Sequence, residues 1–180
     1  MSSEFNTYVE AHADFQQERI TLPLEEIAKR EVDAVTKAPS VVLELFEYWK
    51  ERCTNALPSM ADFQPGDVFT PEKFRWIAWV NLRQADPLSA ILCKHPANVF
   101  GDWSGKTLRD YHNPYHARSC AFEYLTCKMV RRPFYHEIRQ TIGKVSRTYT
   151  RLLLPVADAK RPVTRLYYAV RHVDMSVEGG

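Results

Sequence analysis

Three residues in the middle of the chain have the spacing of metal ligands along a helix. His112, His116 and Cys120 recur every four positions, so a continuous helix would place two imidazoles and a thiol on one face, a set of donors that suits zinc. Pro114 argues against this helix, because proline disfavours helical geometry at the residue that precedes it. The helix then begins near Tyr115 and leaves His112 outside. We therefore predict capping and packing roles for these residues, and no metal site.

The other residues with chemical potential do not complete a cofactor motif. A flavin adduct requires a cysteine in an Asn-Cys-Arg-Phe-like helix, and the sequence around Cys120 lacks that pattern, so we predict a small buried cysteine. Haem requires a histidine that points into an apolar pocket. Four histidines lie near the elements that would form such a pocket, and we interpret them as hydrogen-bonded or surface residues: His95, His112, His116 and His136. The cofactor is therefore left unknown.

Catalytic motifs are also missing from the sequence. There is no G-x-S-x-G nucleophile elbow, and none of the 6 glycines forms a GxGxxG or GxxxxGK phosphate-binding pattern. We therefore predict that the protein is not an enzyme. An unrecognised enzyme with a small substrate is the alternative left open.

Composition and charge argue against several classes of protein. The 180 residues contain 24 basic and 22 acidic side chains, and the net charge of +2 creates no strong field toward nucleic acid or an anionic membrane. The longest apolar runs, Val41–Leu45 and Leu152–Val156, are too short to cross a bilayer. Residues 1–10 lack the features of a secretory signal, and the four cysteines are scattered. We expect a cytoplasmic globular protein with reduced thiols and no membrane partner.

The elements that must position any site begin with helices. A helix with a thin apolar stripe is predicted over 22–35, within an N-terminal extension that we place at 1–38. A stronger helix follows over Ser40–Arg52, with apolar residues at i, i+3, i+4 and i+7 of one face. These residues are Val42, Leu45, Phe46 and Trp49. Such a stripe requires a partner surface.

Five strands and a helical insert are predicted after this helix. The strands are Phe74–Arg83, Leu88–His95, Phe134–Ile142, Lys144–Val156 and Val163–Val173. A turn at Asp86-Pro87 joins the first two, and the insert between the second and third contains a loop region over 98–111 and a helix over Pro114–Lys128. This order favours an α+β fold with one antiparallel sheet. We assign the domain to residues 39–175 and a tail to 176–180.

The alternation along the strands assigns one face of the sheet to the core. The expected core residues are Trp76, Val80, Leu92, Phe122, Leu125, Leu152, Leu154, Leu166 and Val170. The opposite face would carry Ile77 and Trp79 together with a basic and aromatic set: Arg147, Tyr149, Arg151, Arg165, Tyr167 and Arg171. Such a set is able to stack bases and bind phosphates. The nearly neutral net charge favours a wet or covered surface instead, and we do not expect a nucleic-acid partner.

Several short motifs resemble a bacterial PAS-domain family. They are the Tyr48-Trp49 pair, Pro58-Ser59-Met60-Ala61-Asp62-Phe63-Gln64-Pro65, the segment from Gly101 to Leu108, and Arg151-Leu152-Leu153-Leu154-Pro155. The resemblance covers about Leu43 to Val173. It implies a PAS-like five-stranded antiparallel sheet with a central helical insert and, here, N-terminal helices. In function it implies a sensory or signalling module that binds a small molecule or mediates protein interaction.

The expected ligand cavity lies between the apolar face of the sheet and the insert at 98–128. Its expected polar lining is His95, Trp103, His112, Tyr115, Tyr124 and Tyr135. The chain would signal through a separate output protein, with a ligand-free dimerisation or scaffold domain as the main alternative. We expect the stripe of the Ser40–Arg52 helix either to form a homodimer or to cover Ile77 and Trp79 on the outer face of the sheet.

Overall fold

A computed structural model gives the fold of the chain. It describes residues 17–22, 25–31, 40–94, 102–111, 113–142, 145–157 and 162–177. For residues 17–22, 25–31, 40, 142, 145 and 172–177 it describes the backbone alone.

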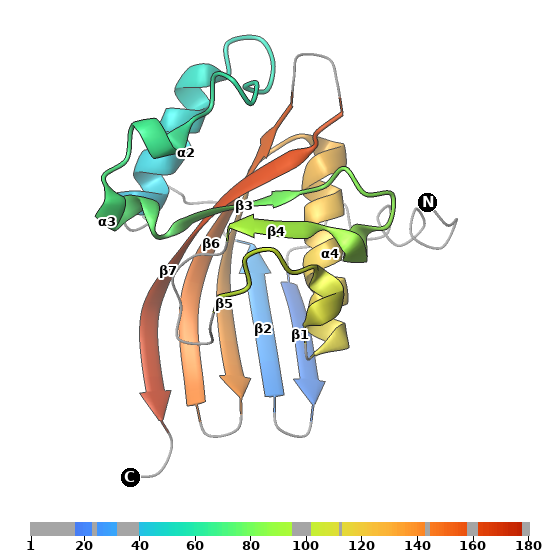
Figure 1. Cartoon of the computed structure of the whole chain (residues 1–180). Helices are drawn as coiled ribbons and strands as arrows, with labels where there is room; N and C mark the ends of the chain where they lie inside the picture. The colour runs from blue at the N-terminus through green and yellow to red at the C-terminus, as the bar shows by residue number, and fades with distance from the viewer. Residues whose placement is uncertain are drawn as a thin grey trace.

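An antiparallel sheet forms the centre of the molecule (Figure 1). Within the described residues it has seven strands in the order β1-β2-β5-β6-β7-β3-β4. The strands are β1 (Gln17–Leu22), β2 (Glu25–Glu31), β3 (Ile77–Asn81), β4 (Ile91–Lys94), β5 (Phe134–Ile142), β6 (Val145–Val156) and β7 (Arg165–Val177). With the helices described below, this arrangement confirms the α+β class.

The five strands expected from the sequence correspond to β3 to β7, although β3 and β4 are shorter than predicted. β3 begins only at Ile77 because Pro71–Phe74 forms the short helix α3. The connection to β4 contains the 3-10 turn η3 (Pro87–Ser89), and the Asp86 carboxylate accepts a hydrogen bond from the Leu88 N–H at 3.2 Å. Asp86-Pro87 is therefore the turn signal that the sequence indicated.

The predicted helix over 22–35 is wrong. β1 and β2 form an antiparallel hairpin, and β2 pairs with β5 from Glu25 opposite Ile142 to Glu31 opposite His136. The sheet therefore begins at Gln17, inside the segment that we expected to be an extension. The pairing of β2 with β5, far along the chain, decides the conformation of this segment. A short stripe of apolar residues does not reveal such a distant partner.

Helix α4 (Pro114–Val130) crosses one face of the sheet. The Asn113 side chain caps its start by accepting hydrogen bonds from the N–H groups of Tyr115 and His116 at 2.9 and 3.0 Å. Its end is set by Arg131, which adopts the left-handed conformation at φ 57°. The helix packs its buried side over a cluster that includes Val80, Leu153, Leu166 and Tyr168.

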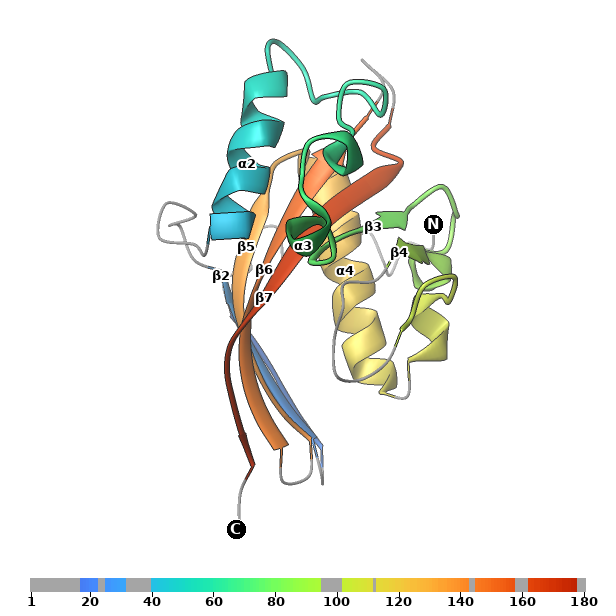
Figure 2. The same cartoon turned by 60° about the vertical axis from the view of Figure 1, so that its left-hand side comes forward.

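Helix α2 (Ser40–Arg52) lies on the opposite face of the sheet (Figure 2). Val42 and Leu45 are fully buried, and the Trp49 indole N–H donates to the carbonyl of Pro155 in β6 at 2.9 Å. The stripe packs against a second cluster that includes Ile77 and, partly buried, Trp79. Val42, Leu45 and Trp49 of the stripe are thus covered within the chain, which is one of the two expected arrangements, and Phe46 is half-buried beside them.

The sheet therefore has a hydrophobic core on each of its two faces. The sequence had predicted a core on one face only. In the antiparallel register Leu153 lies opposite Tyr168 and Leu154 opposite Tyr167, and paired residues share a face. Leu152 and Leu154 consequently belong with α2, while Leu166 and Val170 belong with α4. All of the expected core residues are buried except Trp76, which is half-buried just before β3.

The expected basic and aromatic face does not exist as one surface. Tyr149 and Arg151 are buried on the α4 side, whereas Tyr167 is buried on the α2 side. The register explains this division, because Tyr167 lies opposite Leu154, whose side chain alternates with those of Tyr149 and Arg151 along β6. The residues are thus not available together as a surface for nucleic acid.

Candidate functional site

The location expected for a ligand, beneath α4, is occupied by a buried ionic centre. Arg151 of β6 forms a salt bridge with Glu123 of α4, and their side chains are 6% and 3% exposed. A second guanidinium nitrogen of Arg151 lies 3.8 Å from the Cys120 Sγ. Burial opposes the charge on Arg151, but the neighbouring Glu123 carboxylate holds the pKa of the guanidinium above its usual value. The centre ties the helix to the middle of the sheet.

A row of aromatic and imidazole groups continues from this centre toward the surface. The Cys120 Sγ lies 3.7 Å from the His116 Nε2, and the His116 ring stacks on Tyr111 with centroids 5.5 Å apart. Tyr111 in turn meets the edge of Trp103 at 4.9 Å. Burial raises the pKa of both Tyr111 and Tyr124, so these phenols stay protonated. Among the described residues, these side chains occupy part of the space beneath the helix.

Of the six expected lining residues, the four that the structure describes do not come together. His95 and His112 lie outside the described residues, and Tyr115 is 55% exposed and therefore does not line a cavity. Tyr135 is buried on the α2 face of the sheet. Side chains alternate along β5, and Phe134 and Ile138 are the residues that face α4. Trp103 and Tyr124 lie on the α4 side, the first half-buried and the second fully buried.

A pocket of about 250 Å³ lies beside α4 instead, between the helix and the β3–β4 connection. The connection supplies Leu82, Arg83, Gln84, Ala85, Asp86, Pro87 and Ala90, and the helix supplies Ala121, Leu125 and Lys128. The pocket therefore belongs to the insert side of the sheet, as expected, but it is displaced to the edge formed by β3 and β4.

Apolar side chains make the walls of this pocket and charged groups surround them. Ala90, Ala121 and Leu125 are buried aliphatic residues, whereas Arg83 is exposed. The Lys128 ammonium donates to the Leu82 carbonyl at 3.0 Å, which connects the last turn of the helix to the end of β3. Burial lowers the pKa of this ammonium. Apolar walls with a few placed polar groups are typical of small-molecule sites.

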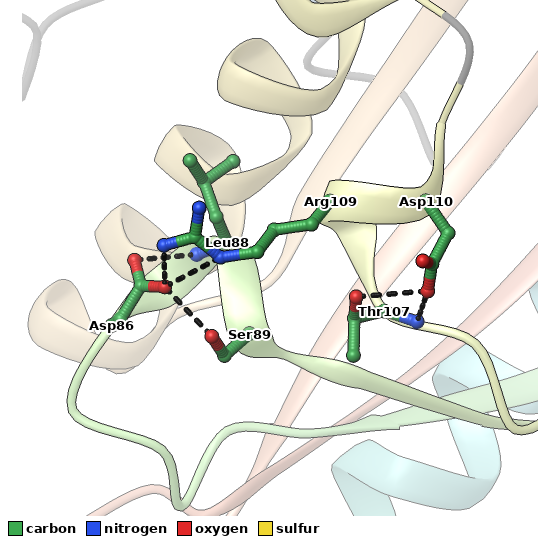
Figure 3. A network of polar contacts seen from close by, with 6 residues as sticks. All are labelled: Asp86, Leu88, Ser89, Thr107, Arg109 and Asp110. Carbon is green, nitrogen blue, oxygen red and sulfur yellow. Dashed lines mark hydrogen bonds and ion pairs between the residues drawn. The ribbon is translucent and has the colours of Figure 1, made fainter.

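The rim of the pocket is braced by Asp86 (Figure 3). Its carboxylate accepts hydrogen bonds from the Ser89 hydroxyl at 2.7 Å and the Leu88 N–H, and it forms an ion pair with Arg109 at 2.6 Å. Burial alone would raise the pKa of Asp86, but these hydrogen bonds and the Arg109 charge lower it. Arg109 belongs to the 3-10 turn η4 (Leu108–Asp110), so the ion pair fastens the insert to the β3–β4 connection.

Few local signals in the sequence indicate this pocket. Its charged members, Arg83, Asp86 and Lys128, come from a turn and from the end of a helix, where charged residues are ordinary. The only local signal was the polar break from Arg83 to Asp86 between two apolar strands. These three residues come together only because of the way α4 crosses the sheet. A local sequence pattern does not predict that crossing.

The described residues contain neither a candidate metal cluster nor a helix that could span a membrane. No group of three His, Cys, Asp or Glu side chains there has the arrangement of a metal site, and His112 of the predicted triplet lies outside the described part of the chain. No helix in that part is long and apolar enough to span a membrane.

Comparisons with known proteins give no relative from which a function can be transferred. No family model, curated protein or solved structure matches the chain. The function is therefore argued from the pocket and its surroundings.

Proposed function

We propose that the protein is a PAS-like module that binds a small molecule in the pocket between α4 and the β3–β4 connection, and that passes the bound state to a separate partner protein. The observation that carries this proposal is the pocket itself, about 250 Å³ in volume and mostly apolar. An antiparallel sheet with a helical insert between the second and third of five strands is the arrangement that the PAS resemblance implies. The β1–β2 hairpin is an addition to that arrangement.

The position of the pocket suggests how binding would be sensed. A ligand there contacts α4 and the segment after β3 at once, so its binding energy adds to the docking of the helix on the sheet. Binding then shifts the population toward the docked helix, which is a change that a partner protein can recognise.

A binding module fits the pocket better than an enzyme does. Three groups with pKa values well above the usual ones lie in the centre beneath α4: Tyr111, Tyr124 and Arg151. None of them lines the pocket. Catalytic sites bring such groups together in a cleft.

A ligand-free scaffold is the second candidate, and the close packing of the described ionic and aromatic side chains beneath α4 favours it. Fragment screening of the full chain by ¹⁵N–¹H correlation spectra separates the two candidates. We expect some fragments to shift the amides of 82–90 and 121–128 together, and an Ala121→Phe variant, which fills the pocket, to abolish those shifts. An Ala85→Trp variant at the open side provides a second way of blocking the pocket. Wild-type spectra that no fragment shifts in these segments would favour the scaffold.

A further inference from the structure

We infer that the pocket selects small anionic ligands, specifically a monocarboxylate with a short apolar body. This inference rests on the proposed function and specifies its ligand class. It follows from three features of the pocket: its balance of charge, the position of Lys128 and the size of the apolar space.

The charges around the pocket leave an excess of positive charge. Lys128 and Arg83 each contribute a cation to the lining, and Asp86 is the acid among the lining residues. The Asp86 carboxylate is already engaged by Arg109, the Ser89 hydroxyl and the Leu88 N–H. Its negative charge is therefore compensated before a ligand arrives, and a ligand meets the two remaining cations.

Lys128 is placed to contact a ligand that enters between the helix and the connection. Its ammonium has three N–H donors, and the Leu82 carbonyl takes one of them at 3.0 Å. The surrounding protein removes water from the ammonium and lowers its pKa, so a charged partner there is worth more than it would be in open solvent. A carboxylate supplies the opposite charge and accepts hydrogen bonds.

The volume and walls of the pocket limit the rest of the ligand. Liquid water occupies about 30 Å³ per molecule, so 250 Å³ corresponds to roughly eight waters. The space is large enough for a single ring or a short aliphatic chain. Ala90, Ala121 and Leu125 offer apolar contact to the body of the ligand, and Lys128 and Arg83 offer charged partners to its anionic end.

Three compounds of one shape and different charge test the inference: benzoate, benzamide and benzamidine. Each is titrated into the full chain and followed by ¹⁵N–¹H spectra. We expect benzoate to shift the amides of 82–90 and 121–128 with a Kd about tenfold lower than that of benzamide, because a hydrogen bond to a charged group is worth more than a neutral one. Benzamidine should bind most weakly.

Variants then assign the selectivity to Lys128. Lys128→Met should weaken benzoate binding about tenfold and leave benzamide binding unchanged, because only the charged contact is removed. Lys128→Arg keeps the charge and should retain the preference for benzoate. Lys50→Met on the exposed side of α2 is the matched control, since it removes the same charge elsewhere. Arg83→Gln should reduce the preference for benzoate even if Lys128→Met does not fold.

Two kinds of failure can be told apart. Equal binding of benzoate and benzamide, or preference for benzamidine, overturns the anionic class while the pocket remains a ligand site. If neither these compounds nor any fragment shifts the two segments, the inference and the proposed function fail together. Benzoate selectivity that survives both Lys128→Met and Arg83→Gln also overturns the inference, because the selecting charge then lies elsewhere.

Discussion

At the scale of single residues, the surroundings of the four cysteines set their reactivity. Cys93 is exposed, Cys53 is half-buried, and Cys120 and Cys127 are buried. Burial raises the pKa of Cys53 to about 11 and that of Cys127 well above its usual value. Exposure therefore favours Cys93 over the other three, and since the thiolate is the reactive form, the raised pKa values slow Cys53 and Cys127 further.

We therefore expect a fast reaction of one thiol with Ellman's reagent at pH 8 in the native protein, followed by slow reaction of the others. Cys93→Ser should remove the fast phase, and Cys53→Ser should leave it intact. The absorbance of the released thiolate measures both. A fast phase that survives Cys93→Ser would show that one of the buried thiols is more accessible than its position indicates.

Asp86 makes a second prediction at this scale. Its pKa is lowered in the folded state, so the carboxylate stabilises the fold at pH values above its unfolded pKa, and this contribution is lost as the pH falls through its folded pKa. Asp86→Asn keeps an oxygen that is able to accept from the Leu88 N–H and removes the charge. Because the group is partly exposed, we expect a loss of no more than about 1 kcal/mol at pH 7.

Melting temperatures between pH 7 and pH 3 measure this effect. The difference between Asp86→Asn and the wild type should shrink toward the acid end, where the wild-type carboxylate is protonated as well. Glu72→Gln, at an exposed carboxylate of α3, is the control for a general loss of negative charge. A difference that stays constant over the whole pH range would contradict an electrostatic role for Asp86.

At the scale of elements, the predictability of the fold depended on whether the deciding contacts are local. The α2 helix and the β5 strand have the bounds that the sequence predicted, because caps, apolar spacing and strand alternation are local signals. The β1–β2 hairpin was missed because β5, far along the chain, decides its conformation. The same limitation applies to the candidate site: Trp103 and Tyr124 were expected on the insert side, but the convergence of Arg83 with Lys128 was not.

The Leu152-Leu153-Leu154 segment shows what a local pattern does contain. Three consecutive leucines cannot all face one side of a strand, and all three are buried. An uninterrupted apolar run is typical of a strand that is covered on both faces. The three leucines therefore indicate a sheet with a core on each face. The alternation of apolar residues along the strands had indicated a core on one face only.

The ion pair between Glu123 of α4 and Arg151 of β6 leads to a further prediction. Removing one member of a buried ion pair leaves an uncompensated charge, so Arg151→Met and Glu123→Met should each cost about 3–5 kcal/mol. The double variant replaces the pair with apolar side chains and should be more stable than either single variant. Urea unfolding followed by circular dichroism measures the four proteins. Additive losses in the double variant would show that Glu123 and Arg151 act independently.

At the scale of the whole molecule, the two helices on opposite faces explain why the sheet can be apolar on both sides. Each helix buries its stripe against a different set of strand residues, and the buried ion pair of Glu123 and Arg151 lies beneath α4. The arrangement leaves the edge near β3 and β4 as the place where a pocket forms. The proposed sensing role depends on that edge, because the described pocket lies there.

The use of the α2 stripe within one chain leads to the last prediction. Trp49 is buried against the sheet and donates to the Pro155 carbonyl, so Trp49→Ala should lower the free energy of unfolding by about 3–5 kcal/mol. Glu47→Ala, on the exposed side of the same helix, should change it by no more than about 0.5 kcal/mol. Light scattering during size exclusion should give the wild type and both variants the mass of one 20.9 kDa chain. A wild-type dimer that Trp49→Ala converts to a stable monomer would instead place this stripe in an interface between two copies.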